Sequence, residues 1–262
     1  LVGEEINSSA ISLGSGDNFM FGGSDVDSST VLFGGGNDSL ILGDAIEDES
    51  SVGLGEGDNF VYVGSEIQGA STLTFGGGSD TLIVEDDVEA STVDLGLGDN
   101  LISVDASIIT STLMAGSGSD TVIIGGGVSS SDISTGADAD FVQIGSGSPA
   151  SIANSTIDLG GDADTLVVNV DAISASTITA GSGIDTLLVD STVTGSSLDL
   201  GDGDAYISVG SSVLTARRHA ARERAPGRVG ELGGGLRSGG EPVPLHRLRR
   251  GHRHGERQPV RP

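Results

Sequence analysis

The stretch Gly34-Gly35-Gly36-Asn37-Asp38-Ser39-Leu40-Ile41-Leu42, preceded by Ser29-Thr30-Val31-Leu32-Phe33, decides the fold. It is a glycine-rich acidic turn between two short runs in which apolar and polar residues alternate. The unit occurs ten times along the chain. The first glycines of these turns, used below as anchors, are Gly14, Gly34, Gly55, Gly76, Gly96, Gly116, Gly136, Gly160, Gly181 and Gly201. The anchors are 20 or 21 residues apart, except that a 24-residue step contains a predicted loop at 145–150.

Further columns keep the same register. Serine stands five residues before every anchor: Ser9, Ser29, Ser50, Ser71, Ser91, Ser111, Ser131, Ser155, Ser176 and Ser196. Apolar residues occupy the positions three before and six after each anchor, as Val31 and Leu40 do. Apolar residues also stand eight after it, except at Gly22, and twelve after it, where Ile152 and Ile173 are expected to fill the two coils whose spacing slips.

Alternation with a period of two indicates strands that turn one face inward. Runs of about four residues are too short to be stable alone, so each must pair with its equivalent one repeat away. Equivalent positions then stack about 4.8 Å apart. The sequence therefore predicts an all-β fold, a parallel β-solenoid (β-roll or β-helix) of about ten coils of about 20 residues. The serine column is expected to be structural, bonding the backbone or the next serine at a corner.

The chain divides into two parts. Residues 1–214 carry the repeats and are expected to begin in mid-coil as a fragment of a longer array, because Val2 and Ile6 match Leu42 and Ile46 in register. Residues 215–262 form an Arg/Gly/Pro-rich tail that we expect to be disordered or derived from a frameshift. All 12 arginines lie in the tail with four glutamates, so the other 34 of the 38 acids lie in the repeats, which contain no Lys or Arg.

The charge distribution and the composition exclude nucleic acid, membrane insertion and disulfides. A field so negative repels phosphates, so we expect no nucleic acid as partner. No apolar run approaches the length of a membrane span, so we expect no membrane insertion. Cysteine is absent, so no disulfide holds the fold together.

The turns combine acids with glycine. Six aspartates stand four residues after the anchor: Asp38, Asp80, Asp120, Asp140, Asp164 and Asp185. Four coils have Asn or Ala there and an aspartate one residue earlier: Asp17, Asp58, Asp99 and Asp204. Charges about 5 Å apart repel by roughly 0.8 kcal/mol even in water-like surroundings. Carboxylates and turn carbonyls without His or Cys form hard oxygen sites, so we predict that these ten aspartates bind Ca²⁺.

Residues 33–41, 75–83, 115–123 and 180–188 match the nonapeptide Gly-Gly-x-Gly-x-Asp-x-U-x at all positions but the first, where U is apolar. The chain thus resembles the RTX-type (haemolysin-type) calcium-binding repeat proteins over about residues 9–213. The resemblance implies calcium bound by turn aspartates and carbonyls, and folding after export to the bacterial exterior. The array is atypical, because it has one such turn per 20-residue coil, whereas RTX arrays usually repeat every nine residues.

We therefore predict a calcium-binding structural or adhesive region of a large secreted or cell-surface bacterial protein. The alternative is a secretion or folding module attached to a catalytic domain, a polysaccharide-modifying enzyme or a protease, outside this sequence. We expect no enzyme activity here, because the repeats contain no Lys, Arg or His to act as a base. Ice binding is a weaker third class, since the position beside Thr30 and Thr72 varies between coils. Bulky outward residues such as Phe19 and Phe60 favour lateral self-association or packing against neighbouring repeats.

Overall fold

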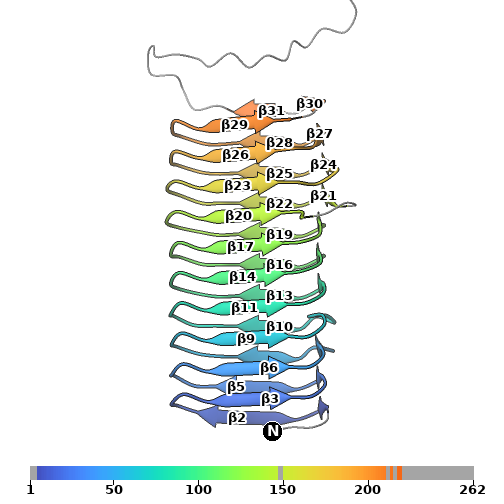
Figure 1. Cartoon of the computed structure of the whole chain (residues 1–262), viewed down its shortest axis with the longest axis vertical. Helices are drawn as coiled ribbons and strands as arrows, with labels where there is room; N and C mark the ends of the chain where they lie inside the picture. The colour runs from blue at the N-terminus through green and yellow to red at the C-terminus, as the bar shows by residue number, and fades with distance from the viewer. Residues whose placement is uncertain (1–4, 147–149, 211–212, 215–216, 220–262) are drawn as a thin grey trace, which may run out of the picture. The chain divides into compact units, whose positions relative to one another are not determined.

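The computed structural model describes residues 5–146, 150–210, 213–214 and 217–219. These residues form an all-β parallel solenoid of about ten coils, as the period predicted (Figure 1). In each coil the chain runs along one strand, turns at the glycines, runs along a second strand and returns through a third, shorter strand. Three parallel sheets therefore surround the core.

The post-turn sheet has ten strands, one after each glycine turn. They are β3 (Phe19–Gly22), β6 (Ser39–Leu42), β9 (Phe60–Val63), β11 (Thr81–Val84), β14 (Leu101–Val104), β17 (Thr121–Ile124), β20 (Phe141–Ile144), β23 (Thr165–Val168), β26 (Thr186–Val189) and β29 (Tyr206–Val209).

The pre-turn sheet has eleven strands. They are β2 (Ala10–Gly14), β5 (Thr30–Phe33), β8 (Ser51–Gly53), β10 (Thr72–Thr74), β13 (Thr92–Asp94), β16 (Thr112–Met114), β19 (Asp132–Ser134), β22 (Thr156–Asp158), β25 (Thr177–Thr179), β28 (Ser197–Asp199) and β31 (Arg217–His219).

The short-strand sheet closes the coils. It consists of β1 (Ile6–Asn7), β4 (Val26–Asp27) and β7 (Ile46–Glu47), followed by β12 (Val88–Glu89), β15 (Ile108–Ile109), β18 (Val128–Ser129), β21 (Ser151–Ala153), β24 (Ala172–Ser174), β27 (Thr192–Thr194) and β30 (Val213–Leu214). Single bridges from Ile67 to Ile46 and to Val88 join its two parts.

The pairing places equivalent residues of successive coils side by side. Leu40 pairs with Met20 and with Val61, and Ile152 pairs with Val128 and with Ile173. The predicted register is thus confirmed, including the coil that follows the 24-residue step. Ile6 pairs with Val26, in the register expected from its match to Ile46, whereas Val2 lies outside the described residues.

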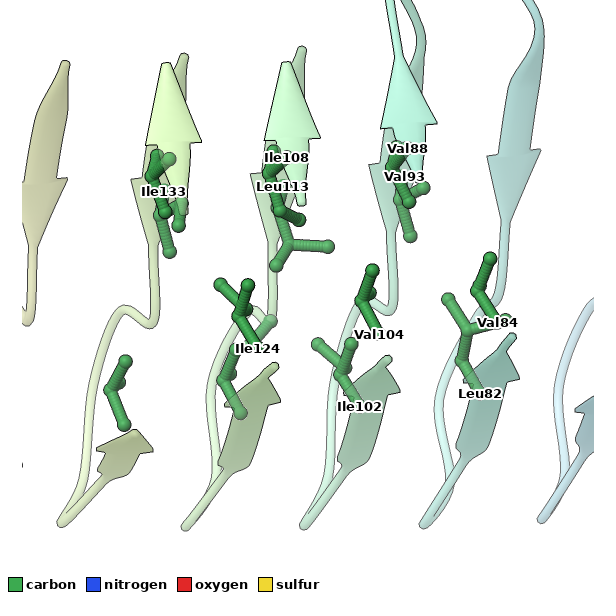
Figure 2. Packing of buried hydrophobic residues seen from close by; sticks show 14 of the residues in the cluster. Leu82, Val84, Val88, Val93, Ile102, Val104, Ile108, Leu113, Ile124 and Ile133 are labelled. Carbon is green, nitrogen blue, oxygen red and sulfur yellow. The ribbon is translucent and has the colours of Figure 1, made fainter. Parts of the chain in front are cut away.

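The core consists of these apolar columns. Side chains such as Leu82, Ile102 and Ile108 are completely buried, and those of successive coils lie one above another between the sheets (Figure 2). Each core side chain therefore packs against its counterparts in the coils on either side, so that stability is distributed along the array rather than concentrated in one centre.

The serine column is a continuous hydrogen-bonded ladder, confirming its structural interpretation. The backbone N–H of each serine donates to Oγ of the serine in the next coil, as from Ser91 to Ser111 and from Ser111 to Ser131, both at 3.0 Å. Ser111 Oγ in turn donates to the carbonyl oxygen of Ile109 or of Val88, at 2.8 and 3.1 Å. The residue before each serine has a positive φ, 52° at Thr110, which turns the corner.

Removing one serine from the ladder should have a measurable, local cost. Ser111→Ala leaves the buried N–H of Ser91 without an acceptor, and we expect a loss of about 1–3 kcal/mol in the free energy of unfolding. The control is Ser130→Ala, because Ser130 is exposed and its equivalents Ala90 and Ala175 already carry alanine at a positive φ. Equal urea midpoints for the two variants would contradict the structural role of the ladder.

The sheet pairing extends further along the chain than the sequence pattern. β31 pairs with β28, so three residues of the segment that we assigned to the tail continue the pre-turn sheet. Strand pairing uses backbone groups alone, and the free edge of β28 accepts an extended segment without apolar alternation. The rest of that segment, residues 215–216 and 220–262, lies outside the described residues. None of the described residues belongs to a helix that could span a membrane.

Candidate calcium site

The glycine turn brings successive backbones into close contact. A Cβ built on Gly116 would overlap the carbonyl oxygen of Gly96, and Gly116 has a φ of 107°. Only glycine tolerates both conditions. The turns therefore stack backbone on backbone, and side chains that point inward after the turn enter a narrow column lined by peptide groups.

From Gly14 to Gly181, the residue four positions after the anchor points into that column, whereas Ala205 in the last coil is exposed. All six aspartates at this position, and also Asn59 and Asn100, are 97% or more buried. Each uses Oδ1 to accept the backbone N–H of its equivalent one coil earlier: Asn59 donates to Asp80 at 2.8 Å, and Asp140 donates to Asp164 at 2.9 Å. The bonds form an unbroken ladder from Asn18 to Asp185.

The asparagines show what surrounds the second atom of the side chain. Nδ2 of Asn59 donates to the carbonyl oxygens of Gly55 and Gly57, at 3.2 and 2.7 Å. Nδ2 of Asn18 does the same to Gly14 and Gly16. Nδ2 of Asn100 donates to the carbonyl oxygens of Gly98 and, in the next coil, Ala115. The amide therefore places its N–H groups among backbone carbonyl oxygens of the turns.

In the aspartate coils an oxygen replaces that amide nitrogen. Oδ2 of all six is buried and has no hydrogen-bond partner: Asp38, Asp80, Asp120, Asp140, Asp164 and Asp185. An acceptor among carbonyl oxygens, without a donor, is costly for a neutral group and more so for an anion. A cation or a proton at this point removes the cost. The donor set, carboxylate and carbonyl oxygen, suits Ca²⁺, so the residues fit the predicted ion.

Burial raises the pKa of these carboxyl groups. Loss of hydration is the largest cause, partly offset by the backbone N–H that each Oδ1 accepts. The pKa of Asp120 rises to about 6 and that of Asp164 to about 7, and neighbouring aspartates add to both increases. The pKa values of Asp80, Asp140 and Asp185 are raised too, mainly by burial.

The arrangement changes along the array. Asparagine and aspartate alternate from Asn18 to Asn100, so each early aspartate lies between two amides. From Asp120 to Asp185 four consecutive coils carry aspartate, and the ladder there runs from carboxylate to carboxylate. This second part, which we call the all-Asp run, has the greatest need for a positive charge.

The other four predicted aspartates point outward. Asp17, Asp58, Asp99 and Asp204 are exposed. Oδ1 of Asp58 accepts the N–H of Ser79 from the next coil at 2.8 Å, and Asp17 and Asp99 make equivalent bonds. All ten aspartates therefore lie in the turns, but on two sides of them, and the outer four already satisfy turn backbone or face solvent.

The described residues contain no group of three or more His, Cys, Asp or Glu side chains able to hold a metal ion. An ion in the inner column would thus bind one or two carboxylates, and backbone carbonyls and water would supply its other ligands. This differs from the column of ten stacked charges that the sequence suggested.

Three comparisons with known proteins bear on this geometry. No family model matches the chain, and none of the curated proteins matches it. One solved structure does. It is the X-ray structure of a hyperactive, Ca²⁺-dependent, β-helical antifreeze protein from an Antarctic bacterium, with a TM-score of 0.69. The match covers 83% of this chain and 72% of the other at 18% identity, so the likeness is one of fold.

Sequence reasoning missed the role of Asn18, Asn59 and Asn100. It treated them as positions where the acid had moved by one residue, whereas they are members of the inner ladder. The signal was present in the parity: the position four after the anchor has the same parity as the buried positions six and eight after it, and the position three after has the opposite parity.

Proposed function

We propose that the solenoid is a calcium-stabilised structural region, with an adhesive role, of a secreted or cell-surface bacterial protein. The observation that carries the proposal is the row of six buried Oδ2 atoms without a hydrogen-bond partner. The asparagine coils support it, because the same place there holds a donor. The Ca²⁺ dependence of the β-helical antifreeze protein and the resemblance to RTX repeats give further support.

Asp38, Asp80, Asp120, Asp140, Asp164 and Asp185 would hold the ions through Oδ2, with carbonyl oxygens of their own turns. Bound calcium would supply the positive charge that these oxygens lack and would link neighbouring coils. Extracellular calcium modules bind at about 0.1–1 mM, which suits a site with so few carboxylates. The four outer aspartates, Asp17, Asp58, Asp99 and Asp204, remain predicted ligands of a weaker kind.

This role is structural rather than catalytic. The coils are uniform, and the repeats carry no Lys, Arg or His for proton transfer or for clamping an acidic substrate. The alternative, a folding or secretion module for a catalytic domain elsewhere in a longer protein, uses the same calcium chemistry. The alternative differs from the main proposal only in that a catalytic domain is attached to the solenoid.

A calcium titration tests the proposal. Far-UV circular dichroism of the demetallated chain should show strand content rising with Ca²⁺ in the range of about 0.1–1 mM, and the urea midpoint should rise with it, since an ion that binds only the folded form stabilises it. Mg²⁺ at equal concentration is the control and should have a smaller effect, because it requires stricter octahedral geometry. Full strand content and an unchanged urea midpoint in chelator would refute the proposal.

A further inference from the structure

The outward face of the post-turn sheet is uncharged along its whole length. Its strands place two outward residues per coil, and none of the twenty is Asp, Glu, Lys, Arg or His. The outward positions of the pre-turn sheet carry Asp94, Asp132 and Asp158, and those of the short-strand sheet carry Glu47 and Glu89. The strands of this face therefore place no charged side chain outward, and carboxylates lie only past the strand ends, where Glu85 interacts with Tyr62.

This face is mostly apolar, and its first outward column is regular. Phe19, Leu101 and Tyr206 on it are 67%, 39% and 60% exposed. The first outward position of each strand alternates over eight coils between a bulky side chain and a small hydroxyl side chain, in the order Phe19, Ser39, Phe60, Thr81, Leu101, Thr121, Phe141 and Thr165. The surface thus has ridges and hollows that repeat every second coil.

We propose that this face binds the same face of a second copy of the chain, with the two coil stacks antiparallel. Charge favours a second copy as the occupant, because among the sheets of the described residues this face alone lets two such acidic chains meet without placing outward carboxylates of the strands opposite each other. The area is also sufficient: ten strands about 4.8 Å apart and about 13 Å long give about 600 Å² per copy, or about 1,200 Å² in all, which reaches the range of stable interfaces.

The alternation of bulky and small side chains sets the relative direction of the two coil stacks. A closed pair has a two-fold axis. If the axis ran along the coil stack, each coil would face its own copy with the strand reversed, so Phe60 would meet Tyr62, one aromatic side chain against another. If the axis runs along the strands, one stack is reversed, and β14 can face β17 of the second copy. In the six central coils bulky side chains then meet small ones at the first outward position: Leu101 faces Thr121, Phe141 faces Thr81 and Phe60 faces Thr165. At the two ends of the stack Phe19 faces Tyr206. Such interdigitation is how packed sheets fill the space between them.

Sedimentation equilibrium of the full chain in saturating Ca²⁺ tests the pair. We expect a dimer whose dissociation constant rises at least tenfold in Ile123→Glu, because the new charge is buried twice in the pair. The matched control is Met114→Glu, the same kind of change on the outward side of the pre-turn sheet, and it should leave the dissociation constant unchanged. Circular dichroism verifies that both variants are folded. A monomeric chain, or equal effects of the two variants, would overturn the pair and leave neighbouring repeats as the occupant.

Spin labels distinguish the two directions, and the absence of native cysteine makes each label unambiguous. The variants are Ser39→Cys and Ser103→Cys, on β6 and β14. In the antiparallel pair the two labels at 39 lie seven coils apart, about 34 Å along the stack, whereas those at 103 lie one coil apart, about 5 Å. Electron paramagnetic resonance should therefore give a much longer distance at 39. Equally short distances at both positions would overturn the antiparallel arrangement. Since the assembly is measured in the folded chain, failure here leaves the calcium proposal untouched.

Discussion

Replacing Asp164 by Asn should stabilise the calcium-free solenoid by about 1–3 kcal/mol, the usual cost of an unsatisfied buried polar group. Oδ1 of the new side chain still accepts the N–H of Asp140, at 2.9 Å in the native chain. Its Nδ2 takes the place of the unpartnered Oδ2 and donates to carbonyls of its own turn, as Nδ2 of Asn59 does. The urea midpoint in demetallated buffer measures the gain.

The same variant should lose part of the response to calcium. An amide offers no negative charge at the inner column, so the stabilisation by saturating Ca²⁺ should fall in Asp164→Asn. The control is Asp132→Asn, which removes the same charge from an exposed outward position and should leave both quantities nearly unchanged. Destabilisation of Asp164→Asn in both the presence and the absence of calcium would show that Oδ2 is not in need of a cation.

The reverse substitution sharpens the test. Asn59→Asp replaces two amide bonds to turn carbonyls with an unpartnered oxygen, so it should cost about 1–3 kcal/mol without calcium. Calcium should restore most of that loss, because the new carboxylate creates the arrangement of Asp80 one coil earlier. In a nearest-neighbour array these changes stay local, so hydrogen exchange should respond in the adjacent coils and not in distant ones.

These predictions depend on the difference between inward and outward aspartates, which the sequence pattern predicted only in part. The columns of serine and of apolar residues and the strand parity followed from the period, because side-chain direction in a strand is fixed by parity. The period did not predict the three-sided cross-section of the coil. Parity also fixes Asp38 as inward and Asp58 as outward. What it leaves open is which neighbour an inward Asp38 contacts, since the direction of a side-chain bond along the stack depends on the backbone geometry of the turn.

The sequence pattern also could not predict how Asn and Asp differ at the inner position. Both residues accept the N–H of the preceding coil, so both continue the ladder and both suit a column of strands. They differ only in the second atom, whose surroundings become visible once the carbonyls of Gly55 and Gly57 are placed beside Asn59. The continuation of the pre-turn sheet by β31 escaped notice for a related reason, because an edge strand pairs through its backbone and imposes no pattern on the residues that join it.

Without calcium the solenoid should be more stable at acidic than at neutral pH, which is the opposite of ordinary acid denaturation. The raised pKa values of the all-Asp run mean that the folded chain holds protons that the unfolded chain releases. The stabilisation is complete below the unfolded pKa of about 4. It is lost as the pH rises through about 6 at Asp120 and about 7 at Asp164.

Calcium should reverse this dependence, because it takes the place of the proton and binds the ionised carboxylates. Urea midpoints between pH 4.5 and 8 should therefore fall with rising pH after ions are removed on a chelating resin, and should rise with pH in about 10 mM Ca²⁺, well above the affinity of such modules. Asp164→Asn should flatten both curves, whereas Asp132→Asn changes only the general repulsion among acids. Midpoints that rise with pH in the ion-free chain would mean that the inner carboxylates are ionised and paired by groups of the chain itself.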